Sequence, residues 1–159
     1  MSVASGVAAA QVKEPGMLSA EDKKGIATTI DQFVEGWKLR DMDEFGKTMT
    51  EDCDWVNIVG MHWHGKEQVV CAHKLLLETR YKGVNVHDLG HYETEIAPGV
   101  AVVIWRSAVD DFTTPQGERV TGMKTMGTLV MVKQQGKWLI RSGQNSTIDA
   151  AAAAHDPGK

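Results

Sequence analysis

The clearest metal-ligand pattern in the chain is His62-Trp63-His64, two histidines one residue apart. On a β-strand both imidazoles would point to the same side, as two ligands of one metal ion must. A third ligand could come from one of three other histidines, His73, His87 or His91. No cysteine or carboxylate completes a familiar metal-binding spacing, so we expect His62 and His64 to lie at the surface or at a pocket rim. We expect neither a bound metal nor another cofactor.

A second candidate for chemistry is Asn57, which alternation places on the same strand face as Trp55. In one interpretation Trp55 forms an apolar wall and Asn57 orients a ligand by hydrogen bonds. In the other, Trp55 belongs to the core and Asn57 satisfies backbone groups of the turn at Gly60. A buried amide needs a partner in either case, so the sequence leaves both interpretations open.

His73 is the candidate acid–base group, because it lies on the apolar face of a predicted helix and imidazole titrates near neutral pH. Cys53 is a poor candidate nucleophile. It lies between the carboxylates of Asp52 and Asp54, which raise the pKa of a thiol. No glycine-rich phosphate loop, nucleotide fingerprint or serine–histidine–aspartate pattern is present in the sequence.

Gln144 and Asn145 end the last predicted strand, and only one of them can face the interior. If Trp138 and Ile140 point inward, alternation also turns Gln144 inward. A bulge at Gly143 would reverse this assignment and turn Asn145 inward instead.

These residues need a scaffold, and a long hairpin from Glu118 to Thr147 is its main element. The first arm carries Val120, Met126, Val130 and Val132 at alternating positions, which predicts one buried face. The turn at 134–136 ends in glycine, which tolerates a positive φ. The arm is longer than an ordinary strand of about 5–6 residues. We therefore expect kinks or bulges at its two glycines, Gly122 and Gly127.

Helices are predicted mainly before this hairpin and strands after them. Residues 19–37 have a capping serine and an apolar stripe, 41–49 form a short second helix, and 66–81 form a third. Strands are expected at 54–58, 61–64, 84–89, 91–96 and 100–110, the last placing Trp105 and Arg106 on opposite faces. The order predicts an α+β domain whose helices cover one face of a strongly curved antiparallel sheet, forming a cone with an open end.

Composition restricts the class of protein. The chain has 159 residues and a formal net charge of −4, without a basic run or basic helix face, so we expect no nucleic-acid partner. No apolar run could span a bilayer, and we expect no membrane association. Two cysteines do not make a disulfide framework, which favours a cytoplasmic location. We expect a disordered tail over residues 1–18, one domain over 19–148, and a low-complexity tail over 149–159.

At this point the chain resembles a known family. The segments VEGWKLRDMDEF, TEDCDWVNIVG, HGKEQVVCAH and KWLIRSGQNST, in this order, are similar to the SnoaL-like branch of the nuclear transport factor 2-like superfamily. Within this branch the chain resembles small uncharacterised proteins of the SgcJ/EcaC type. The residues that carry the resemblance are Trp37, Asp41, Asp52, Asn57, Gly60, Gly65, Trp138, Gln144 and Asn145.

The resemblance implies a cystatin-like cone with a pocket under the helices, and a homodimer packed through the outer sheet face. The residues that we expect to line the pocket are Phe33, Trp37, Trp55, Asn57, Met61, Trp63, His73, Trp105, Met123, Gln144 and Asn145. A ketosteroid isomerase would need a tyrosine, a carboxylate base and a protonated acid. The resemblance aligns these with Phe33, Asn57 and Gly127 or Thr128, so that mechanism is not expected.

Three functions stay open. The first is binding of a small apolar ligand in a pocket of aromatic, methionine and amide groups, which we favour. The second is an enzyme (isomerase, cyclase, dehydratase or oxidoreductase type) on an apolar polyketide-like or aromatic metabolite, with His73 or another pocket histidine as acid–base group. The third is a dimeric interaction domain. The first two predict a cavity of a few hundred cubic ångströms, whereas the third predicts a filled interior.

Overall fold

The structure is a computed structural model that describes residues 17–158. Helix α1 (Ala20–Leu39) begins at Ser19, whose Oγ accepts a hydrogen bond from the Asp22 amide at 3.0 Å, and it ends where Arg40 adopts a left-handed φ of 59°. Helix α2 (Met42–Gly46) packs closely against it. A Cβ on Gly36 would lie 2.9 Å from the Phe45 backbone, so the two helices can approach this closely only because residue 36 is glycine.

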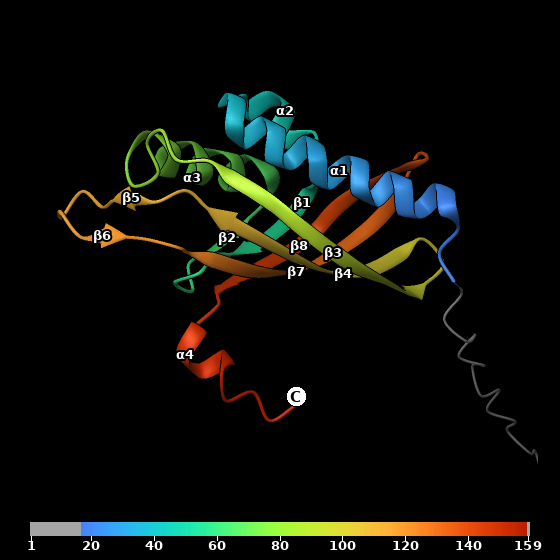
Figure 1. The fold of residues 1–159 in the computed structure, drawn as a ribbon. Coiled ribbons are helices and arrows are strands. Elements are labelled where there is room, and N and C mark those ends of the chain that lie inside the picture. The colour runs from blue at the N-terminus through green and yellow to red at the C-terminus, as the bar shows by residue number, and fades with distance from the viewer. Residues whose placement is uncertain (1–16, 159) are drawn as a thin grey trace, which may run out of the picture.

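A six-stranded sheet has the order β2-β1-β8-β7-β4-β3. Its strands are β1 (Met49–Val56), β2 (His62–His64), β3 (Val86–Ala97), β4 (Val100–Val109), β7 (Lys124–Gln134) and β8 (Lys137–Thr147). All neighbouring pairs are antiparallel except β1 and β8, which run parallel. Helices α1, α2 and α3 (Lys66–Glu78) cover one face of the curved sheet (Figure 1). The fold is therefore the predicted α+β architecture with one parallel pair.

A small separate hairpin extends beyond the end of the sheet. It consists of β5 (Phe112–Thr113) and β6 (Arg119–Val120), joined by a turn in which the Gly117 amide donates to the Thr114 carbonyl at 2.9 Å. Gly122 adopts a φ of +62° between β6 and β7, so the long predicted arm is broken there. At Gly127, by contrast, β7 keeps regular pairing with both neighbours, so no kink occurs at this position.

The buried face of β7 is the opposite of the predicted one. Leu129 and Met131 are 2% and 0% exposed, whereas Met126 is 40% exposed on the outer face. Val130 and Val132 are only half-buried on that outer face. Both faces of this strand carry apolar residues, so alternation indicates a strand but does not select the side that the helices cover.

Several element boundaries also differ from the predicted ones. Strand β1 begins at Met49 rather than at residue 54, because α2 stops where Thr48 Oγ1 donates to the Phe45 carbonyl at 2.6 Å. Residues 86–97 form one strand that continues through Gly90, rather than two strands. Helix α3 ends at Glu78, three residues before its predicted end.

The predicted tails have partial structure. Residues 1–16 lie outside the described part of the chain, but Leu18 is 8% exposed and packs into the core. At the other end, α4 (Ala150–Ala153) is a single helical turn capped by Asp149. Among the described residues, no helix has both the length and the apolar character that a membrane crossing requires.

Candidate functional site

A cavity of about 320 Å³ lies between the helices and the inner face of the sheet. Nine of the eleven predicted pocket residues line it, namely Phe33, Trp37, Trp55, Asn57, Met61, His73, Trp105, Met123 and Asn145. The other lining residues were not predicted and are Ile58, Val59, Leu76, Arg80, Tyr81, Val86, Ser107, Val109 and Thr125. Ser107 and Val109 follow Trp105 at alternate positions of β4, so the period of that strand could have identified them.

Aromatic rings form the walls of this cavity. Trp55 on β1 stacks with Phe33 of α1 at a centroid distance of 5.6 Å, and Trp105 on β4 meets Phe33 edge-on at 5.7 Å. Gly143 on β8 provides the space for Trp55, because a Cβ there would lie 2.4 Å from the indole ring. The indole therefore lies directly over the β8 backbone.

His73 lies among these rings on α3. Its Nδ1–H donates to the Val69 carbonyl at 2.8 Å, so Nε2 points away from the helix backbone. The rings of Phe45, Trp55 and Trp63 have centroids 5.0–5.3 Å from the imidazole. Burial lowers the pKa of His73 to about 4, and the imidazole is therefore neutral at neutral pH. It can accept a hydrogen bond at Nε2, but it holds no proton there to donate.

Asn57 is used by the backbone of its own turn. Its Oδ1 accepts hydrogen bonds from the Val59 amide at 3.1 Å and from the Met61 amide at 2.9 Å. Trp55 belongs to the buried core. These contacts match the interpretation in which Asn57 satisfies backbone groups of its turn and Trp55 belongs to the core. Asn57 nevertheless also borders the cavity. Any contribution of Asn57 to ligand binding would use its NH₂ group.

Gln144 and Asn145 take the orientation that we predicted for a bulged strand, and not the one that plain alternation predicted. Gln144 is exposed, and Asn145 lines the cavity. The cause is an irregularity in the pairing of β7 with β8, where Val130 faces Ser142 but Met131 faces Ile140. The extra residue is Arg141, so the bulge occurs two residues earlier than the Gly143 position that the sequence indicated. Trp63, the other residue absent from the lining, is half-buried on β2 beside His73.

The polar groups of the cavity are few and mostly uncharged. Ser107 Oγ and Thr125 Oγ1 share a hydrogen bond of 2.6 Å. Asn145 Oδ1 is buried without a hydrogen-bond partner among the described residues. Arg80 is the single charged residue of the lining, and its guanidinium lies over the rings of Tyr81 and Phe112. No carboxylate lines the cavity within the described chain, so His73 has no acidic partner there.

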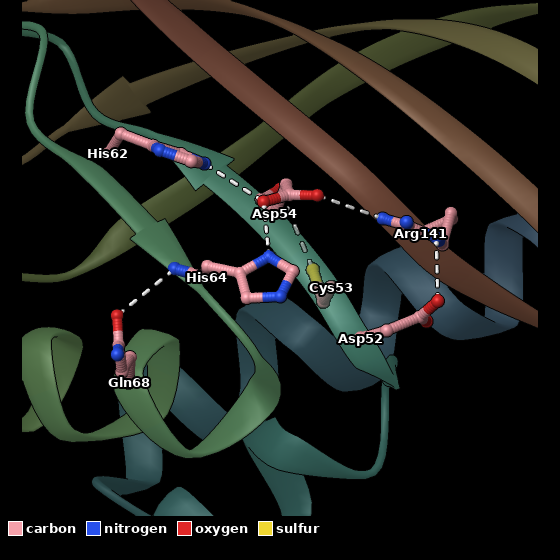
Figure 2. Close-up of polar contacts among 7 residues, drawn as sticks. All are labelled: Asp52, Cys53, Asp54, His62, His64, Gln68 and Arg141. Atoms are coloured by element: carbon pink, nitrogen blue, oxygen red, sulfur yellow. Dashed lines mark hydrogen bonds and ion pairs between the residues drawn. The ribbon is translucent and has the colours of Figure 1, made fainter.

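The predicted His-x-His pair lies on the other side of β1 (Figure 2). His62 Nε2 and His64 Nδ1 both contact Asp54 Oδ1, at 2.9 Å and 2.8 Å. Both imidazoles point to the same side, as predicted, but the third group is Asp54 rather than another histidine. Arg141 Nη1 donates to the second oxygen of Asp54 at 3.1 Å, and its Nε contacts Asp52 at 3.2 Å.

This Asp54 cluster, defined as Asp54 with His62, His64 and Arg141, is a hydrogen-bonded network around one carboxylate, with Arg141 as its permanent ion-pair partner. The hydrogen bond from His64, followed by those from His62 and Arg141, holds the pKa of Asp54 well below its usual range. Within residues 17–158 no group of three or more potential ligands is arranged to hold a metal ion. The neighbouring Cys53 is buried, and chiefly this burial raises its pKa to about 12.

Comparisons with known proteins concern the family and the fold. Residues 26–150 match the sequence profile of the SnoaL-like domain. No curated protein matches the chain. An uncharacterised protein of cystatin-like fold from Caulobacter vibrioides is 30% identical and superposes with a TM-score of 0.81, over 87% of this chain and 98% of its own.

Two further solved structures have the same fold at low identity. Aln2 from a Streptomyces species is 16% identical with a TM-score of 0.72, covering 87% of this chain and 99% of its own. A type 2 hexachlorocyclohexane dehydrochlorinase is 11% identical with a TM-score of 0.71, covering 80% of this chain and 85% of its own. At these identities the likeness concerns the fold alone.

Proposed function

Because the chain belongs to the SnoaL-like domain family, whose fold encloses a cavity here, we propose that it binds a small, uncharged and mainly apolar molecule. The observation that carries this proposal is the cavity of about 320 Å³ walled by Phe33, Trp55 and Trp105. Its volume is at the lower end of the range of small-molecule pockets, about 300–1,000 Å³. An interaction domain of the kind considered above would have a filled interior instead.

The electrostatics of the cavity favour binding over acid–base catalysis. General acid–base groups work best when their pKa lies near the operating pH. The pKa of His73 is lowered to about 4, and no carboxylate of the described chain lines the cavity to form a pair with it. A cationic ligand would lose its hydration without gaining a buried counter-charge, and an anionic ligand would find only Arg80, whose guanidinium already lies over the rings of Tyr81 and Phe112. An enzyme on an apolar metabolite stays the alternative.

The proposal can be tested with the neutral fluorophore N-phenyl-1-naphthylamine, whose emission rises in apolar surroundings. We expect saturable binding of one probe per chain, with quenching of tryptophan emission because Trp37, Trp55 and Trp105 line the cavity. The variant Met123→Trp fills the cavity and should weaken binding at least tenfold. Met126→Trp is the matched control, since Met126 lies on the outer face of the neighbouring β7.

Two results would contradict the proposal. Binding that is not saturable would indicate adsorption to the surface, and equal binding by both tryptophan variants would locate the probe outside the cavity. Native mass spectrometry of protein purified gently from its own source would detect a small molecule that is already bound. A defined small mass released on denaturation would identify the ligand, whereas its chemical conversion on incubation would favour the enzyme.

The predicted homodimer has a suitable surface. We propose that two copies pair through the outer sheet face, where Tyr92 and Met126 are 70% and 40% exposed beside half-buried Ile104 and Val130. Exposed apolar side chains on one sheet face are a common feature of interfaces. Sedimentation velocity would test this, with a monomer at micromolar concentration as the contradicting result. The cytoplasmic location and the absence of a nucleic-acid partner stay predictions.

A further inference from the structure

One polar side-chain atom of a residue that lines the cavity has no hydrogen-bond partner among the described residues. Asn145 Oδ1 is buried, and no described residue donates a hydrogen bond to it. Buried polar atoms in native proteins are nearly always paired, and leaving one unpaired costs about 1–3 kcal/mol. Because Asn145 lines the cavity, a small rotation of its amide would present this acceptor to a donor that arrives from outside the protein.

The strand register explains why the amide lacks an internal partner. On the inner face, Asn145 of β8 pairs with Gly127 of β7, and Gly127 pairs in turn with Trp105 of β4. The residue between the amide and the indole therefore has no side chain. A Cβ at Gly127 would meet Trp105 at 3.6 Å, so the space above this glycine is bordered by an aromatic ring.

The next positions along the same strands add a second polar feature. Ser107 of β4 pairs with Thr125 of β7, and their hydroxyl groups share the 2.6 Å hydrogen bond. One of the two O–H groups is the donor in that bond, so the other keeps its proton for another acceptor. This end of the cavity thus offers one acceptor, Asn145 Oδ1, and one spare hydroxyl donor. A ligand hydroxyl matches both, because it donates one hydrogen bond and accepts others.

The remaining walls define the rest of the ligand. Phe33, Trp55 and Trp105 present ring faces and edges, which favour a flat aromatic body. Building on the proposed function, we propose that the ligand is a neutral aromatic alcohol of the phenol type, whose O–H donates to Asn145 Oδ1 while its ring packs against the tryptophans. Deprotonation would remove the donor, so the neutral form is the one bound.

The test compares three probes that differ in one group: 2-naphthol, 2-methoxynaphthalene and naphthalene. Each displaces N-phenyl-1-naphthylamine from the wild-type protein at pH 7. We expect 2-naphthol to bind about tenfold tighter than either of the others, as expected for one net hydrogen bond of about 1.4 kcal/mol. The variant Asn145→Leu should abolish this preference and leave naphthalene binding similar or tighter. Gln144→Leu is the control, because residue 144 is exposed and should leave the preference unchanged.

The outcomes separate this inference from the function that it builds on. Equal displacement by all three probes would overturn the hydroxyl assignment while binding in the cavity stood. Equal, tight binding of 2-naphthol and 2-methoxynaphthalene would show that the oxygen is recognised as an acceptor, which also overturns it. A preference that survives in Asn145→Leu would reject Asn145 as the recognising group. Failure of N-phenyl-1-naphthylamine itself to bind would reject the proposed function. The wild-type comparison holds even if Asn145→Leu does not fold.

Discussion

The two faces of strand β1 place histidines in opposite environments, one buried among aromatic rings and the other solvated beside a carboxylate. On the inner face Trp55 packs against His73, which is 5% exposed and surrounded by rings. On the outer face the preceding residue, Asp54, binds His62 and His64, whose side chains are 58% and 67% exposed. One residue step along the strand thus separates a neutral, buried imidazole from two solvated imidazoles on a carboxylate.

This contrast shows why histidine content says little about function until the neighbours are known. Among the described residues the cavity wall has no carboxylate and a single charged residue, Arg80, whose guanidinium lies over two aromatic rings, so the inner side suits an uncharged ligand. On the outer side, both oxygens of Asp54 are already occupied by protein donors. The residues that looked most like metal ligands therefore hold a carboxylate, and the cavity on the other side is the better candidate site.

Protonation of His73 should give the largest effect on stability. Its pKa of about 4 lies below the ordinary value of 6.5. Between pH 4 and pH 6.5, therefore, this histidine is protonated in the unfolded chain but not in the folded chain. Stability should fall by about 3 kcal/mol as the pH drops from 6.5 to 4. His73→Gln, which can keep a hydrogen bond to the Val69 carbonyl, should not show this decline in stability. Urea unfolding between pH 4 and 7 measures it.

The same substitution at His155 is the control. His155 is exposed near the end of the described chain, and His155→Gln should retain the wild-type pH dependence. If His73→Gln and wild type lose stability in parallel below pH 6.5, the buried imidazole is not the group responsible. That result would contradict the description of His73 as a neutral histidine on the inner face.

Gly143→Ala should have the next largest effect, because it acts directly on the inner face. The new Cβ would lie 2.4 Å from the Trp55 ring, so the indole must move into the cavity. We expect a loss of about 1–3 kcal/mol in urea unfolding, typical of overpacking, together with weaker N-phenyl-1-naphthylamine binding. Gly127→Ala is the matched control for stability, since the nearest atoms to its new Cβ lie at an ordinary 3.6 Å. Equal stability of the two variants would mean that Trp55 does not need the space above Gly143.

Asp54→Asn should have the smallest effect, confined to the outer face. The pKa of Asp54 is depressed, so its carboxylate stabilises the fold above the ordinary aspartate value of about 3.9 and ceases to do so as the pH falls through the folded value. The variant should be slightly less stable at pH 7, and the difference should shrink below pH 4. Binding of N-phenyl-1-naphthylamine should not change. A stability difference that is independent of pH would exclude the carboxylate as its cause.

The sequence predicted the parts of this arrangement that depend on local pattern. Ser19 and Asp41 cap α1 and α2, and alternation correctly separates Trp105 from Arg106. Prediction from the sequence failed where two arrangements satisfied the same hydrophobic pattern. Strand β7 is apolar on both faces, and only the packing of the helices decides that Leu129 rather than Met126 is buried.

The register between strands that are distant in sequence was the other feature that the sequence did not predict. The Arg141 bulge turns Asn145 into the cavity; Gly143 indicated a possible bulge in this strand, but its position two residues earlier depends on the pairing with β7. Likewise, Asp54 precedes His62 by eight residues, and only the antiparallel pairing of β1 with β2 brings the carboxylate to both histidines. The family resemblance supplied the general location of the pocket, because the chemistry of single residues does not reveal a shared cavity.

The parallel pairing of β1 with β8 has a consequence for biosynthesis. Strand β1 leaves the ribosome early, but one of its two neighbours is β8, which is the last strand to be made and lies inside the sheet order rather than at an edge. Until β8 is made, β1 has only the three-residue β2 beside it, and isolated two-stranded pairs are marginal in water. A nascent or truncated chain that stops before residue 137 would therefore lack this inner strand of the sheet and leave the side of Trp55 that packs on Gly143 uncovered.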